Sequence, residues 1–187
     1  MPPYIKKISK FRYMSACSIT LNGIDFSCKD SVGGIKRIWL SDWTEAAPSI
    51  DDNRYKATMT GFKLYRIRTG NGSMNSTLNA DESAGTVYVT TDLNVRFTKL
   101  SEDSRNEVAE ILKGNTAAIV EDNLGNYWGL GAEHPLTLSA GSINTGAAMA
   151  DFAGYDITLQ DYSTTLPYLL DESLISSLPQ SVGEDSD

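Results

Sequence analysis

Residues 85–114 read GTVYVTTDLNVRFTKLSEDSRNEVAEILKG, and this stretch decides the fold because a long alternating segment runs directly into a capped helix. From Val87 to Phe97 the apolar side chains share one parity and the polar ones hold the other, with Thr91 as the interruption on the apolar side. Successive side chains of a strand point to opposite faces, so the pattern predicts an antiparallel strand with one buried and one wet face. At about 3.3 Å per residue it spans roughly 40 Å, a length that needs support from several other strands.

The helix is predicted over residues 101–113, immediately after this strand. Ser101 is a good N-cap, and the two acidic residues that follow it suit the positive end of the helix dipole. The apolar stripe consists of Val108, Ile111 and Leu112. Gly114 is expected to end the helix because glycine readily adopts a positive φ. A helix this short is not stable alone, so its stripe is expected to pack on the sheet.

Composition indicates one sizeable core in a 187-residue chain, with 41% hydrophobic and 21% charged residues. Apolar runs of membrane-spanning length are lacking, and residues 1–7 lack the apolar region of a secretory signal. The sequence therefore predicts a protein that is made in a reducing cytoplasm and has no membrane partner.

The cysteines and the histidine are too few for a dedicated zinc site. Cys17 and Cys28 either form a disulfide or remain separate, partly buried thiols, and both alternatives stay open. His134 precedes a proline in an expected loop, and no Ser-His-Asp order or metal cluster forms around it. We therefore expect no catalytic residue, no cofactor site, no metal site and no enzyme activity.

Two short motifs resemble functional sites and have plainer explanations. Gly33 and Gly34 precede an expected strand, but neither phosphate-loop pattern is present, so a turn is predicted. Asp51 and Asp52 could act as an acid–base pair. They have no evident partners in the sequence, so we expect two solvated carboxylates.

The rest of the chain predicts further short strands joined by turns. The middle region is expected to form long hairpin arms with flexible tips. Further strands are expected at 35–40, 58–69, 74–78, 116–121, 127–130 and 155–160, turns at 69–73 and 122–126, loops at 43–57 and 79–85, and a stretch of small residues at 140–150.

Four segments follow from these patterns. Residues 1–15 form a basic arm with aromatic residues, which is either a solvated terminus or an arm that docks on a neighbouring subunit. Residues 16–165 are expected to form a single domain, which the resemblance given below implies to be a β-sandwich. Residues 166–178 are a C-terminal extension with apolar patches that could pack on a neighbour. Residues 179–187 are an acidic tail expected to be disordered.

The formal net charge of −8 argues against a grip on nucleic acid, which needs clustered lysine and arginine residues. Such a charge suits a surface that must not hold DNA passing nearby.

Five short motifs stand out: CKDSVGGIK at 28–36, RNE at 105–107, IVEDNLGNYW at 119–128, TGAA at 145–148 and DFAGYDITL at 151–159. Together they resemble a family of virion structural proteins from tailed phages of Bacteroidetes hosts, including crAss-like phages. The resemblance covers roughly residues 17–165, and no match extends from Ser163 onward.

The resemblance implies a mainly β fold, an antiparallel β-sandwich or barrel of the tail tube type with one flanking helix at about 101–113. It implies a subunit that stacks in rings to form the channel through which genomic DNA passes. The expected partners are copies of itself in a hexamer, with a dodecamer as the alternative, and other tail or connector proteins. The expected location is the virion tail, after synthesis in the host cytoplasm.

Two alternatives to a tail tube subunit stay open. One is a ring or connector component of a short tail, that is, a head–tail adaptor with a different subunit number. The other is a β-sandwich that binds carbohydrate or a host surface through aromatic side chains, although core packing explains the same residues. The residues concerned are Trp39, Trp43, Trp128, Tyr65 and Tyr127.

Overall fold

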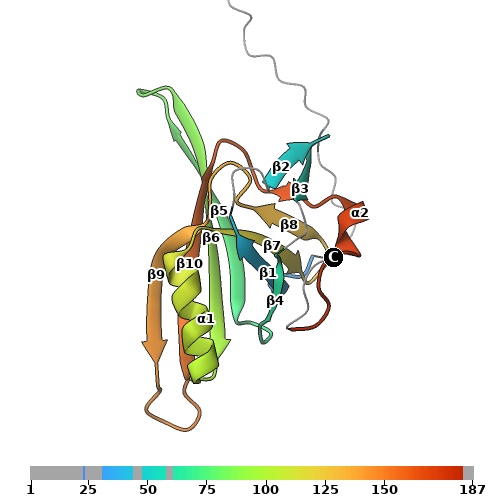
Figure 1. The fold of residues 1–187 in the computed structure, drawn as a ribbon. Helices are drawn as coiled ribbons and strands as arrows, with labels where there is room; N and C mark the ends of the chain where they lie inside the picture. The colour runs from blue at the N-terminus through green and yellow to red at the C-terminus, as the bar shows by residue number, and fades with distance from the viewer. Residues whose placement is uncertain (1–22, 24–30, 44–47, 58–60, 183–187) are drawn as a thin grey trace, which may run out of the picture. The chain divides into compact units, whose positions relative to one another are not determined.

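Strand β6 (Thr86–Thr98) is the longest element of the fold, which is an antiparallel β-sandwich with a flanking helix, as predicted (Figure 1). The structure is a computed structural model that describes Gly23 and residues 31–43, 48–57 and 61–182. The predicted arm at 1–15 and both cysteines lie outside the described residues.

One sheet is built around β6. It pairs with β5 (Gly72–Asp81) on one side and with β10 (Gly154–Ser163) on the other, over ten residue pairs each. Strand β9 (Thr137–Asn144) completes the order β5-β6-β10-β9. The predicted alternation of β6 is confirmed, since Val89, Leu93 and Val95 are buried. Thr91 is buried among them, and its hydroxyl lies 2.9 Å from the Ser76 hydroxyl.

The second sheet has five strands in the order β11-β8-β7-β1-β4. The strands are β1 (Ile35–Asp42), β4 (Lys63–Arg66), β7 (Thr116–Asp122), β8 (Tyr127–Leu130) and β11 (Tyr168–Leu169). A separate ribbon pairs β2 (Pro48–Asp51) with β3 (Arg54–Ala57). The predicted β7–β8 hairpin is confirmed.

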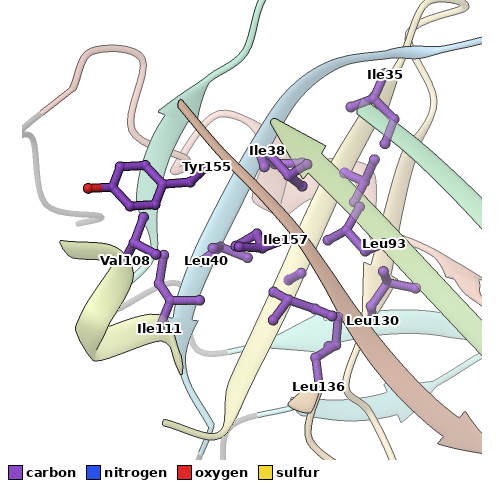
Figure 2. Packing of buried hydrophobic residues seen from close by; sticks show 14 residues of the cluster. Ile35, Ile38, Leu40, Leu93, Val108, Ile111, Leu130, Leu136, Tyr155 and Ile157 are labelled. Atoms are coloured by element: carbon purple, nitrogen blue, oxygen red, sulfur yellow. The ribbon is translucent and has the colours of Figure 1, made fainter. Parts of the chain in front are cut away.

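The five-stranded sheet is buried on both faces, which explains the continuous apolar run of β7. The inner cluster lies between the two sheets and contains Ile38, Leu40 and Val120 from this sheet (Figure 2). The outer cluster contains Trp39 and Ile119, whose side chains point the other way. This second cluster needs a cover of its own.

That cover comes from the β2–β3 ribbon and the C-terminal segment, which were predicted to be a loop and an extension. Tyr55 of β3, Leu170 and Leu178 are all buried in the outer cluster. The Trp39 indole N–H donates to the carbonyl oxygen of Pro179 at 2.9 Å. Residues 166–178, which include α2 (Glu172–Ile175), therefore pack on their own chain, and so does the start of the expected acidic tail. Residues 183–187 lie outside the described residues.

Helix α1 (Glu102–Lys113) closes one side of the sandwich, as the figures show. The predicted cap is confirmed, since the Ser104 backbone N–H donates to the Ser101 hydroxyl at 3.3 Å and Ser104 caps Ser101 in return. Val108 and Ile111 are buried, but Leu112 is 41% exposed. The expected positive φ at Gly114 is wrong: φ is −89° because the chain enters β7 in an extended conformation. Of the described helices, neither is long and apolar enough to cross a membrane.

Two predicted loops contain strand residues, although 82–85 form a turn. Residues 43–57 include the β2–β3 ribbon, whose turn places Asp52 and Asn53 at φ values of 50° and 59°. Short polar side chains tolerate this left-handed conformation, so the turn residues carried a signal that was missed. Strand β5 continues to Asp81 through the start of the second expected loop. The strand expected at 58–69 is shorter, since β4 covers Lys63–Arg66 and 58–60 lie outside the described residues.

Strand β9 was missed because a bulge breaks its alternation. Leu138 pairs with Leu159 and Ile143 pairs with Tyr155, so both lie on the core face. Their sequence numbers differ in parity because the register shifts by one residue between them. Because of this shift, the apolar residues of β9 do not alternate regularly with the polar ones. The sequence therefore indicated only a stretch of small residues at 140–150.

A substitution at Gly129 tests whether Tyr55 packs tightly over the outer cluster. A Cβ atom at this position would overlap the ring of the fully buried Tyr55. We expect Gly129→Ala to lower the free energy of unfolding by about 1–3 kcal/mol, measured by urea denaturation. Gly141→Ala is the control, because its Cβ would meet neighbours no closer than 3.7 Å. Equal stability of the two variants would contradict the packing.

Candidate functional site: the polar face of the four-stranded sheet

One face of the four-stranded sheet forms the inner cluster, and the other is polar. We call this second surface the polar face. The pairing register places its members side by side across all four strands. They are Ser73, Asn75, Thr77 and Asn79 of β5, Thr90, Asp92, Asn94 and Arg96 of β6, Asp156, Thr158, Gln160 and Tyr162 of β10, and Thr137, Ser142 and Asn144 of β9. Each of these side chains is half-exposed or exposed.

An ion pair lies at one end of the polar face. Arg96 Nε donates to Asp156 Oδ2 at 2.7 Å, and the two residues are cross-strand partners. Asn94 donates to the other oxygen of Asp156 at 3.0 Å and to the Thr158 hydroxyl at 3.1 Å. Phe152 packs against the Arg96 guanidinium, 5.5 Å from the ring centroid. The arginine of this face is therefore held by its own neighbours.

A second group of hydrogen bonds crosses the middle of the face. Gln160 donates from its amide to Asp92 at 2.7 Å, and the Tyr162 hydroxyl donates to Gln160 at 2.6 Å. Asn79 donates to the Thr90 hydroxyl at 3.2 Å. These amides, hydroxyls and carboxylates satisfy one another, so the surface is hydrophilic without a cluster of positive charge.

The charge of the polar face is close to neutral. Asp92 and Asp156 contribute two negative charges and Arg96 contributes one positive charge, which leaves −1. A surface that grips phosphates needs several unpaired lysines or arginines, because affinity comes from releasing counterions. Among its described residues the polar face has no such cluster of unpaired cations.

The polar face ends at two edge strands. Within the described residues, β5 and β9 each pair with one strand only, β6 and β10 respectively. An edge strand presents unpaired backbone N–H and C=O groups and is a template for pairing with another chain. Both lateral borders of the face can therefore join another sheet.

The residues considered as catalytic candidates are not brought together. His134 is exposed in the loop after β8. Asp51 pairs with Lys56 across the β2–β3 ribbon at 2.8 Å, and Asp52 lies exposed in the turn. The contact with Lys56 lowers the pKa of Asp51 below its usual range. Within the described ranges, no three His, Cys, Asp or Glu side chains lie where they could hold a metal ion.

The glycine pair was predicted to form a turn, and in the structure Gly34 lies at a bend directly before β1. Gly34 has a φ of +102°, and the Asn123 side-chain amide donates to the Gly33 carbonyl oxygen at 2.7 Å. This contact joins the start of β1 to the β7–β8 turn. The contact uses a backbone carbonyl oxygen, whereas a phosphate loop binds its ligand through backbone N–H groups.

The aromatic residues considered for sugar binding do not form an exposed platform. Trp39 is fully buried, which overturns its role as an exposed ring. Trp43 donates its indole N–H to the Gly131 carbonyl oxygen at 2.8 Å, and Trp128 donates to Asp122 at 3.1 Å. The other two are half-buried: Tyr127 packs on Trp39, and the Tyr65 hydroxyl donates to Glu107. Core packing accounts for these rings.

Two buried carboxylates were missed by sequence reasoning. Glu121 is almost fully buried and accepts from Lys36 at 2.9 Å and from Arg37. Burial raises its pKa, but the hydrogen bonds and charges of the two cations outweigh burial and lower the pKa overall. The cross-strand position of Glu121 opposite Arg37 is visible only once the register is known.

Asp161 is the second buried carboxylate and is only partly satisfied. One oxygen accepts from the Gly131 backbone N–H at 3.1 Å, and the other has no hydrogen-bond partner among the described residues. Burial raises the pKa of Asp161 above its usual range, while the Gly131 hydrogen bond and nearby His134 oppose the rise. The side chain lies where β10 meets the end of β8, a structural junction.

Asp161 makes the stability of the fold depend on pH. The folded state holds this proton more tightly than the unfolded state, so stability falls as pH rises above the ordinary carboxyl range. We expect the urea midpoint of Asp161→Asn to exceed that of the unsubstituted protein near pH 7, with the difference shrinking toward about pH 4. Glu82→Gln, in an exposed turn, is the control. A pH-independent difference would contradict the role of the charge.

The chain matches no protein family, no curated protein and no solved structure.

Proposed function

We propose that the chain is a phage virion structural protein, a tail tube subunit that stacks in rings to form the DNA-conducting channel. The observation that carries this proposal is a polar face bounded by two edge strands. Neighbouring strands of the sheet alternate in direction, so β9 of one copy would run antiparallel to β5 of the next. Such pairing joins the sheets of successive copies and removes both edges on ring closure.

The chemistry of the polar face supports its place at the channel wall. A wall that conducts DNA must be wetted without holding phosphates. The hydrogen-bonded amides and hydroxyls make the face wettable. The ion pair of Arg96 with Asp156 keeps the face from holding phosphates, because it neutralises the positive charge of the face.

The number of subunits separates the tube from the alternative of a connector or head–tail adaptor ring. Four strands from each of six copies make a 24-stranded barrel, and twelve copies double that number. The diameter of a closed barrel grows roughly in proportion to its strand number. The same pairing of edge strands can build a tube or a connector ring, so the number of subunits in the ring distinguishes the two functions.

Electron microscopy of the purified protein tests the proposal directly. We expect rings or tubes with an open centre in negative stain, and masses in light scattering that are multiples of 20.4 kDa. Sixfold rings that stack support a tube, and single rings of higher symmetry support a connector. A protein that stays monomeric at all concentrations, and also when mixed with preformed tails, would contradict both.

DNA binding tests the polar face separately. We expect the unsubstituted protein to bind duplex DNA no better than a neutral protein at physiological salt, in a fluorescence anisotropy titration. Asn75→Lys with Thr77→Lys changes the face from −1 to +1 and should create tighter, salt-sensitive binding. Val32→Lys with Leu124→Lys adds the same charge at exposed sites elsewhere and is the control. Tight, salt-sensitive binding by the unsubstituted protein would refute a non-adhesive wall.

A further inference from the structure

The β5–β6 hairpin carries apolar side chains beyond the sandwich. Leu78 and Val87 are each 67% exposed, although both continue the core face of their strands. Val89, the cross-strand partner of Leu78, is 2% exposed, so burial stops between these positions. Figure 1 shows this green hairpin projecting past the other strands of the sheet. We call residues 78–87 the hairpin end, an apolar surface without a cover among the described residues.

An apolar groove of about 370 Å³ lies between α1 and β9. Val108, Leu112, Leu138, Ile143 and Tyr155 contribute to its lining. Leu112 is 41% exposed and Ile143 is 69% exposed, so the groove is open to a partner. The open groove also explains why Leu112 departs from the predicted buried stripe.

The hairpin end and the groove cannot meet within one chain. β5 and β9 occupy opposite edges of the same sheet, with β6 and β10 between them. Both surfaces belong to the core face, because Leu138 pairs with the buried Leu159 and Leu78 pairs with the buried Val89. Along the sheet the two surfaces lie at different levels, because Leu78 is level with Val89 and Ile143 is level with Phe97. A second copy at the β5 edge would therefore bring its groove to Leu78 and Val87 when it is shifted along the strands by about eight residues, roughly 26 Å.

The charges of the two surfaces are complementary. Asp81 and Glu82 are exposed at the turn of the hairpin end. Of the described residues that line the groove, Arg105 carries the charge. The acidic residues Glu107 and Glu110 of the same helix border a different hollow, beside β1 and β4. The hairpin end, which has an acidic turn and apolar side chains, is therefore complementary in charge and polarity to the apolar groove with Arg105 at its border.

We infer that the hairpin end of one copy packs into the α1–β9 groove of a second copy. The contact is heterologous, since different surfaces of the two copies meet, and its repetition produces a ring or a filament. The inference rests on the self-assembly in the proposed function and names the side chains that drive it. Burial of Leu78 and Val87 against Leu112 and Ile143 supplies an apolar contact beside the backbone pairing of the edges.

Two variants and their mixture test the contact. The hairpin variant is Leu78→Glu with Val87→Glu, and the groove variant is Leu112→Glu with Ile143→Glu. In sedimentation velocity we expect each variant alone to self-associate about a hundredfold more weakly than the unsubstituted protein. An equimolar mixture should form a one-to-one dimer, because it restores one intact hairpin end and one intact groove. Leu124→Glu, at an exposed turn residue, should assemble normally.

The outcomes separate this inference from the proposed function. Variants that assemble like the unsubstituted protein, or a mixture that stays monomeric while the unsubstituted protein assembles, would overturn the contact and leave the tube intact. An unsubstituted protein that stays monomeric at all concentrations, and also when mixed with preformed tails, would overturn both. Circular dichroism and thermal unfolding check that each variant is folded. If the groove variant unfolds, Ile143→Ser replaces it, because this side chain is the more exposed of the two.

Discussion

Backbone pairing on both sides of β6 is the interaction on which the rest of the structure depends. Ten residue pairs with β5 and ten with β10 hold this strand in the interior of its sheet. One parity of β6 supplies the inner cluster and the other supplies the polar face. The β5–β6 pairing continues past the sandwich and produces the hairpin end. A single alternating strand therefore creates the core, the candidate channel wall and the candidate contact with a second copy.

The five-stranded sheet solves a different physical problem, because both of its faces are apolar. The four-stranded sheet and α1 cover one face, and the β2–β3 ribbon and C-terminal segment cover the other. The two buried carboxylates of this fold differ in their hydrogen-bond partners. Glu121 has two cationic partners that offset its desolvation, whereas Asp161 keeps an oxygen without a partner. Glu121, whose pKa is lowered, is expected to stabilise the fold above the ordinary carboxyl range, whereas Asp161, whose pKa is raised, is expected to stabilise it less as pH rises.

The proposed assembly follows from what the described residues leave uncovered. Edge strands favour pairing with another chain, and exposed apolar side chains favour burial. Here the edges border a hydrophilic face, while the exposed apolar side chains lie on the opposite side of the same sheet. Copies joined edge to edge would bury the apolar side chains between them and leave the polar face as a continuous wall. The edge strands and the exposed apolar side chains thus both favour copies joined edge to edge.

The sequence by itself determined the elements whose signals are local. The alternation of β6, the Ser101 cap of α1 and the turn between β7 and β8 each depend on neighbouring residues, and each was predicted. Tertiary structure decided what depends on distant partners. The bulge in β9, the burial of Trp39 under Pro179 and the opposition of Glu121 and Arg37 arise from pairing between remote segments. The polar face depends on both the sequence and the tertiary structure. The alternation of polar residues within a strand is visible in the sequence, but only the pairing register places Arg96 opposite Asp156.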